Sequence, residues 1–159
     1  MGHLLGVRYL VAKQDNAVSP PSLSGDLLDR TYRADLVNWF AAHPDIAPAI
    51  GGPIDFTSAI RETTVFLFGE HGGLIFEWCA PDTYEAHIML TKAGRGAWGI
   101  EATKEALRKL GAGKVWARIV PDNRALAMHA VRCGFERLGI KTLYVGGEPR
   151  QYHIYEWSK

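Results

Sequence analysis

The chain of 159 residues contains only two cysteines, Cys79 and Cys133, and no CxxC pair. This scarcity excludes a disulfide-stapled scaffold, and no histidine or cysteine spacing is typical of a zinc site. We therefore expect two free thiols, no bound metal and a reducing compartment, the cytoplasm. The sequence pairs neither thiol with a histidine, so an acyl-enzyme formed on cysteine is not expected.

The sequence also lacks an apolar run long enough to span a bilayer, and Met1–Lys13 lacks the features of a signal peptide. Its formal net charge is only +1, from 18 basic and 17 acidic residues, so a general attraction to nucleic acid is not expected. With 47% hydrophobic and 22% charged residues, the composition is that of a globular protein. These features predict one domain over residues 1–159, with no membrane or nucleic-acid partner.

The stretch from Tyr84 to Phe135 organises the chain. It is predicted to form a strand, a turn, a helix, a second strand and a second helix, at Tyr84–Leu90, Thr91–Gly99, Ile100–Leu110, Lys114–Val120 and Asn123–Cys133. The turn carries three glycines within six residues. A glycine turn before a helix favours phosphate binding, because the backbone can approach closely and the helix N-terminus is partially positive. Arg95 adds a permanent cation.

The remaining segments alternate strand and turn signals around one amphipathic pattern. Six elements are expected outside the central stretch: strands at Leu4–Ala12, Thr64–Phe68, Leu74–Cys79, Arg137–Val145 and Gln151–Trp157, and a helix at Leu27–Ala42. Together these segments predict an α/β fold. Its sheet has about seven strands, mostly antiparallel, with helices on both faces and one parallel crossover from Tyr84–Leu90 to Val115–Val120.

Two segments of the central stretch resemble the GNAT superfamily of acyl-CoA N-acyltransferases. Gly94-Arg95-Gly96 fits the glycine part of the family motif Arg/Gln-x-x-Gly-x-Gly/Ala, although Thr91 stands where Arg or Gln is expected. In a second register, Arg95-Gly96 matches the frequent Arg-Gly pair, and Trp98 replaces the later glycine. Asn123 and Gly134-Phe135 have the Asn-(ten residues)-Gly-Phe spacing of the next family motif. With His43–Ile46 and Gly51-Gly52 upstream, the arrangement is also similar to GNAT-like proteins of phages and prophages.

The resemblance implies acetyl-CoA as the acyl donor. It places the pyrophosphate at the glycine turn, the pantetheine arm and acetyl carbonyl at the strand end, and an asparagine beside the pantetheine. The residues expected to contact acetyl-CoA are Ile88, Met89, Leu90, Gly94, Arg95, Gly96, Ala97, Trp98, Gly99 and Asn123. From the residues alone, the glycines could serve backbone geometry only, and Asn123 could be only a helix cap. Trp98 could either cover the CoA channel or fill it.

Acetyl transfer to an amine needs a base. His87 shares a strand face with Glu85 and titrates near neutrality, so it is the first candidate. Glu77 on the preceding strand is the second. Either residue could instead be a solvated side chain on an exposed sheet face. The family often has a tyrosine four residues before Gly-Phe as general acid, and here that position is Ala130.

The sequence therefore predicts an N-acyltransferase that moves an acetyl group from acetyl-CoA to the amine of a small molecule or peptide. Ala130 and the incomplete glycine motif keep an alternative open. That alternative is a non-catalytic GNAT-fold protein that binds CoA or serves as a phage- or virion-associated interaction protein. Self-association into a homodimer is also left open.

Overall fold

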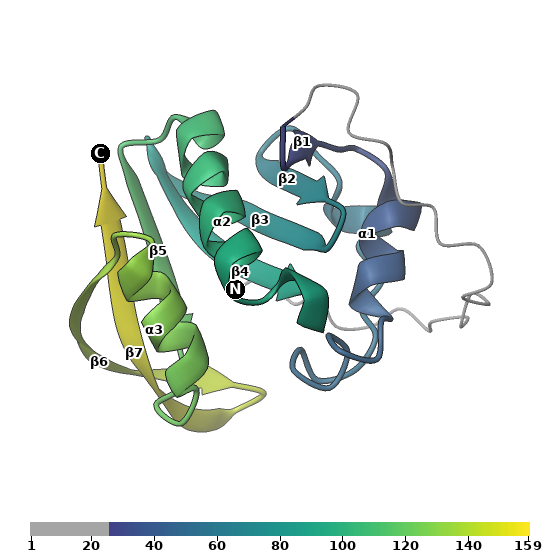
Figure 1. The fold of residues 1–159 in the computed structure, drawn as a ribbon. Coiled ribbons are helices and arrows are strands. Elements are labelled where there is room, and N and C mark those ends of the chain that lie inside the picture. Colours follow the sequence, from purple (N-terminus) through teal and green to yellow (C-terminus); the bar gives the residue numbers. More distant parts are fainter. Residues whose placement is uncertain (1–25) are drawn as a thin grey trace.

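Short runs of β-branched and aromatic residues, separated by tight turns, build a seven-stranded sheet (Figure 1). The computed structural model describes residues 26–159, so the strand predicted at Leu4–Ala12 lies outside the described residues. The strands are β1 Asp29–Arg30, β2 Thr64–Gly69, β3 Gly72–Ala80, β4 Thr83–Leu90, β5 Lys114–Ile119, β6 Glu136–Val145 and β7 Glu148–Ser158. Their spatial order is β1-β2-β3-β4-β5-β7-β6, and only β4 and β5 are parallel. The predicted fold class is confirmed.

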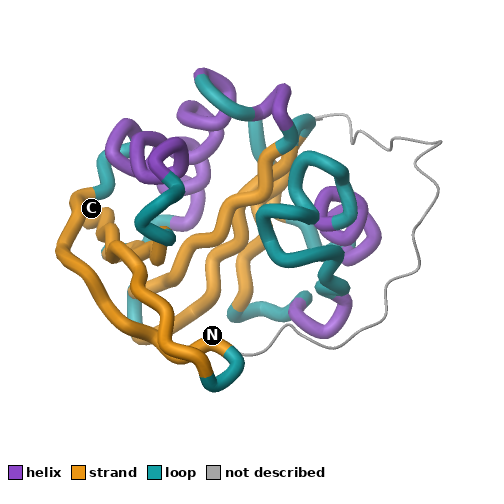
Figure 2. The backbone as a smooth tube through the Cα atoms, turned by 90° about the horizontal axis from the view of Figure 1, so that it is seen from below, coloured by secondary structure: helices purple, strands orange, loops and turns teal. Residues whose placement is uncertain are grey.

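Helices cover both faces of this sheet (Figure 2). The helical elements are α1 Ala34–Ala41, η1 Thr57–Ala59, η2 Lys92–Gly94, α2 Ala97–Leu110 and α3 Arg124–Arg132. Alternate residues of β2 enter two separate cores: Val65 and Leu67 pack with residues of α2 and α3, whereas Phe66 and Phe68 pack with those of α1. We call the second side the α1 face. Within residues 26–159 no helix combines the length and the apolar character needed to cross a bilayer.

The single parallel contact in the sheet is short. β4 and β5 pair only from Thr83 with Lys114 to Glu85 with Trp116. Beyond that point Ala86–Leu90 pairs with β3 on one side, and no strand of the described chain pairs with its other edge. Backbone N–H and C=O groups along that edge are thus available to another partner.

Two helix boundaries differ from the prediction. The helix expected over Leu27–Ala42 is wrong in its first part, because Asp29–Arg30 is strand β1 and α1 spans only Ala34–Ala41. Contacts with α2 override the helical periodicity there: the Leu28 N–H donates to Glu105 at 2.8 Å, and Lys109 donates to the Leu28 carbonyl. These partners are distant in sequence, so no local pattern shows them.

Helix α2 begins at Ala97, three residues before the predicted start at Ile100, so the end of the predicted glycine turn is its first turn. The second half of the chain follows the prediction more closely. Asn123 precedes α3, and Gly134 ends it with φ of 97°. Gly146 and Gly147 take φ of 60° and 83° between β6 and β7, as a tight hairpin turn requires.

Candidate active site

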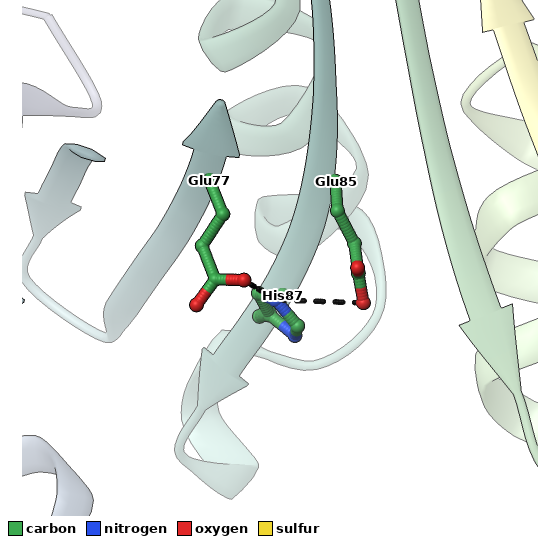
Figure 3. A group of neighbouring side chains, drawn as sticks. All are labelled: Glu77, Glu85 and His87. Atoms are coloured by element: carbon green, nitrogen blue, oxygen red, sulfur yellow. Dashed lines mark ion pairs between the residues drawn. The ribbon is translucent and has the colours of Figure 1, made fainter. Parts of the chain in front are cut away.

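Three polar side chains from neighbouring strands converge on the α1 face (Figure 3). Glu77 lies on β3 and is paired with Glu85 on β4, and His87 follows two residues later on the same face of β4. Nε2 of His87 lies 3.5 Å from Oε2 of Glu77 and 3.7 Å from Oε1 of Glu85. The structure therefore brings together the two residues that the sequence offered as alternative bases.

Glu85 is the most buried member of this cluster, and an arginine on β5 holds it. Nε of Arg118 donates to Oε1 of Glu85 at 2.8 Å, and Nη2 donates to Oε2 at 3.0 Å. The two side chains are only 13% and 4% exposed. The guanidinium carbon also lies 5.6 and 5.7 Å from the ring centres of Trp116 and Tyr152. This bidentate pair neutralises a carboxylate that would be costly to bury alone, and it joins β4 to β5 where their pairing ends, from Glu85 in the last register pair to Arg118 two residues beyond it.

Glu77 and His87 form the part of the cluster that retains capacity for proton transfer. The neighbouring His87 ring lowers the pKa of Glu77, so this carboxyl is ionised at neutral pH. At 3.5 Å their contact is long for a hydrogen bond, and it becomes an ion pair only when His87 is protonated. Nε2 of His87 is shielded from solvent and makes no hydrogen bond within the described chain. A nitrogen in this position can accept a proton that Glu77 would then stabilise.

The cluster has the composition of a metal site, which no sequence spacing indicated. One potential ligand atom from each of Glu77, Glu85 and His87 lies within 4.8 Å of the others. Both oxygens of Glu85 are, however, engaged by Arg118. A cation would have to displace that guanidinium and would then lie beside its positive charge. The electrostatics therefore favour a proton-transfer role over metal binding.

The predicted cofactor turn begins where β4 ends. Gly96 precedes α2 with φ of 91°, a conformation that residues with a Cβ rarely adopt. The first backbone bond into the helix runs from the Ile100 N–H to the Gly96 carbonyl at 3.0 Å, and no described side chain caps the helix start. The N–H groups of Ala97, Trp98 and Gly99 consequently have no partner in the helix. Together with the helix dipole they offer a site for an anion such as a phosphate.

Two other glycines of the turn serve close packing. A Cβ on Gly94 would lie 2.7 Å from Cβ of His71, in the β2–β3 turn. A Cβ on Gly99 would lie 2.6 Å from the Gly94 carbonyl oxygen and 2.8 Å from the Leu90 side chain. The ring of Trp98 packs edge-on against His71, with ring centres 5.0 Å apart. These contacts hold the start of α2 against the beginning of β3 and the end of β4.

Arg95 is exposed in the turn and has a contact that sequence reasoning missed. Its Nη2 donates to the backbone carbonyl of Asp45 at 2.8 Å. The Asp45 carboxylate in turn accepts the N–H of Lys92 at 2.8 Å, and this bond lowers the pKa of Asp45. The Arg95 guanidinium keeps four N–H donors after this bond, enough to contact a phosphate as well. That phosphate contact stays a prediction.

The start of α3 shows the structural role that the sequence allowed for Asn123. Its Oδ1 caps the helix by accepting the N–H of Leu126 at 3.1 Å, while contact with pantetheine stays a prediction. Ala130 is buried, and its methyl side chain offers no hydroxyl at the position of the family tyrosine. Nε2 of the adjacent His129 lies 2.9 Å from Oγ1 of Thr103 on α2, and burial lowers the pKa of His129. His129 therefore joins the two helices as a neutral side chain.

The proton-transfer cluster and the anion-binding turn lie at the two ends of the unpaired stretch of β4. Glu85 and His87 lie at its beginning, and Leu90 leads directly into η2. The predicted donor-contacting residues Ile88, Met89 and Leu90 lie between them. Arg118 is the functional neighbour that the sequence analysis missed; its only signal was a charge inside an otherwise apolar strand.

Neither a scan of protein-family models nor a search of curated proteins finds a match. Solved structures do match. A ribosomal-protein-S5-alanine acetyltransferase from Vibrio fischeri has a TM-score of 0.60 and 11% identity, over 82% of this chain and 91% of that one. The microcin C7 self-immunity acetyltransferase MccE, solved with acetyl-CoA and AMP, has a TM-score of 0.53 and 20% identity over 62% of each chain.

A third similar structure is an acetyltransferase of the GNAT family from Streptococcus pneumoniae. It has a TM-score of 0.52 and 13% identity, over 64% of this chain and 70% of that one. Identities of 11–20% establish similarity of fold and leave the acceptor and the acyl donor undefined. The sheet order, the short parallel contact and these structural matches together show that the chain has the fold of the GNAT N-acetyltransferases.

Proposed function

We propose that this protein transfers an acetyl group from acetyl-CoA to the amine of a small molecule or peptide. The observation that carries the proposal is the position of the Glu77–Glu85–His87 cluster where β4 and β5 separate. A donor along the free edge of Ala86–Leu90 would there meet an acceptor on the face that carries the base. MccE, which has a similar fold, was solved with acetyl-CoA, and this supports acetyl-CoA as the donor.

Donor binding would use backbone groups first. The free N–H groups of Ala97, Trp98 and Gly99 would hold the pyrophosphate, and Arg95 would add a charge-assisted contact. The unpaired edge of β4 would bind the amide groups of the pantetheine arm as a neighbouring strand would. This arrangement needs few specific side chains, which is consistent with an incomplete sequence motif.

The reaction would be a direct transfer. The amine nitrogen attacks the thioester carbonyl carbon, His87 removes one proton from that nitrogen, and the carbon–sulfur bond breaks to release the CoA thiolate. The ionised Glu77 stabilises the imidazolium that forms on His87. Glu85, already neutralised by Arg118, fixes the other side of the ring. Holding donor and acceptor together would supply most of the rate, up to about 7–11 kcal/mol in well-oriented cases.

The alanine at the position of the family tyrosine is compatible with this chemistry. A thiol has a pKa of about 8.5, so the thiolate is a fair leaving group and can take its proton from water after the bond breaks. Removal of the proton from the acceptor is then the demanding step. The cluster around His87 addresses that step.

The test combines acetyl-CoA calorimetry with turnover of an amine panel containing a polyamine, an aminoglycoside and a peptide. With an amine that reacts, His87→Gln should lower kcat/KM by about 10²–10⁴-fold, the usual contribution of a general base. The control His153→Gln changes a histidine of β7 that contacts Arg137, and it should retain full activity. Binding of acetyl-CoA without turnover of any amine would replace this proposal by the non-catalytic alternative. Failure to bind acetyl-CoA would reject acetyl-CoA as the acyl donor of this protein.

A further inference from the structure

A single residue fastens the loop after α1 to the cofactor turn. The Asp45 carboxylate accepts the N–H of Lys92 at 2.8 Å, and its other oxygen lies 4.0 Å from Nζ of Lys92. The Asp45 backbone carbonyl accepts from Nη2 of Arg95 at 2.8 Å. His43 completes its surroundings: Nδ1 accepts the Asp45 N–H at 3.1 Å and lies 3.8 Å from the carboxylate. We call these contacts of Asp45 with Lys92 and Arg95 the Asp45 clip.

The loop held by this clip, residues 43–52, borders the face that carries the proposed base. Ile46 is buried in the α1 core with Met89 and Ile75. Met89 follows His87 by two residues on the same face of β4, and Ile75 is the register partner of His87. The loop therefore packs on the acceptor side of the sheet, whereas Lys92 and Arg95 belong to the turn proposed for the donor.

Arg95 is shared between these two sides. Its guanidinium uses one donor on the Asp45 carbonyl and retains four others in a rigid planar group. A phosphate that binds the free N–H groups of α2 and accepts from the remaining donors would fix the orientation of this side chain. Fixing the guanidinium strengthens the same hydrogen bond to the loop, because less conformational freedom is lost when that bond forms.

We propose that the Asp45 clip couples the two substrate sites, so that binding of the CoA diphosphate to the turn orders the acceptor-side loop 43–52. Asp45 is thus a positioning residue. This inference rests on the proposed use of CoA, but its readout needs no knowledge of the acceptor. By reciprocity, an acceptor that orders the loop would tighten CoA binding by the same factor.

The experiment measures amide hydrogen exchange of the loop with and without saturating CoA. The amides of Ala47, Ile50 and Gly52 donate to carbonyls within the loop, so their exchange reports its opening. In the wild type, CoA should slow their exchange by about tenfold, the effect of one strengthened charge-assisted bond. In Arg95→Met, which removes the bond to the Asp45 carbonyl, saturating CoA should slow it by less than about twofold while calorimetry still detects CoA binding.

Two further variants separate coupling from general loosening. Asp45→Asn keeps an oxygen that can accept the Lys92 N–H and should retain most of the slowing. Asp35→Ala removes a carboxylate of α1 that pairs with Arg33 at the surface, and it should behave as wild type. CoA binding to the wild type without slower exchange in the loop would overturn this inference and leave the proposed function intact. Absence of CoA binding to the wild type would overturn both.

Discussion

Replacement of Arg118 by methionine tests the buried ion pair beneath the candidate active site. The substitution keeps an apolar stem of similar length but leaves the Glu85 carboxylate, 4% exposed, without its bidentate partner. At an effective dielectric constant of about 20, two charges roughly 4 Å apart interact by about 4 kcal/mol. Removal of one member of a buried pair typically costs about 3–5 kcal/mol, which agrees with this value.

The expected loss is large for a protein of this size. Natural domains are stable by about 5–15 kcal/mol, so Arg118→Met should remove about a fifth of that or more. Urea denaturation should show the loss directly, and the melting temperature should fall by about 6–20 °C, at about 2–4 °C for each kcal/mol. The cluster around His87 should also lose its order, so kcat/KM for a reacting amine should decrease with stability.

A double-mutant cycle isolates the pair itself. Glu85→Gln leaves the charge of Arg118 unpaired and should also destabilise, whereas Glu85→Gln with Arg118→Met should cost less than the two single losses added together. Arg137→Met is the control, because Arg137 is exposed on β6 and its only side-chain hydrogen bond within the described residues is to His153; it should change stability by less than about 0.5 kcal/mol. A loss below about 1 kcal/mol for Arg118→Met, or additive single losses, would refute the argument.

Three further predictions concern the turn, the helix end and the carboxylate. Arg95→Ala should weaken CoA binding by about 1–3 kcal/mol, the value of a charge-assisted contact, and unchanged affinity in calorimetry would remove Arg95 from the phosphate site. Gly134→Val should destabilise by more than about 1 kcal/mol in urea denaturation, because φ is 97° and a Cβ would lie 3.4 Å from the Trp157 ring. The pKa of Glu77 is lowered in the fold, so its contribution to stability is complete above its unfolded value of about 4.3 and is lost as pH falls through the folded value. The stability difference between wild type and Glu77→Gln should accordingly shrink from about pH 6, above the unfolded pKa, to about pH 3, below it. A pH-independent difference would contradict the lowered pKa of Glu77.

Local patterns predicted those parts of the fold that local physics decides. Alternation along Tyr84–Leu90 placed Glu85 and His87 on one face, and Gly134 and Asn123 marked the ends of α3. The helix predicted over Leu27–Arg30 was wrong because the backbone of Leu28 is hydrogen-bonded to Glu105 and Lys109, far along the chain. Tertiary contacts of this kind override a short periodic signal.

The sequence predicted some residues of the candidate site, but not the contacts between them. His87 and Glu77 follow from strand register, but the sequence presented them as alternatives, whereas β3–β4 pairing makes them neighbours. Arg118 could not be assigned, because its partner depends on how far β4 and β5 stay paired. Asp45 was equally hidden, since its contacts with Lys92 and Arg95 cross a sequence separation of 47 and 50 residues.

The short contact between β4 and β5 also bears on how the chain can be divided. The β4–β5 contact divides the sheet into two parts, each continuous in sequence and built from antiparallel strands. Residues 29–90 form β1 to β4, and residues 114–158 form β5 to β7. Helix α2 and the glycine-containing link Gly111–Gly113 are the covalent connection between them. Two fragments cut in this link would each keep a hairpin-based half-sheet, and burial of the shared core would draw them together. The GNAT fold of this chain is thus suited to complementation between fragments, with the candidate active site regenerated only on reassembly.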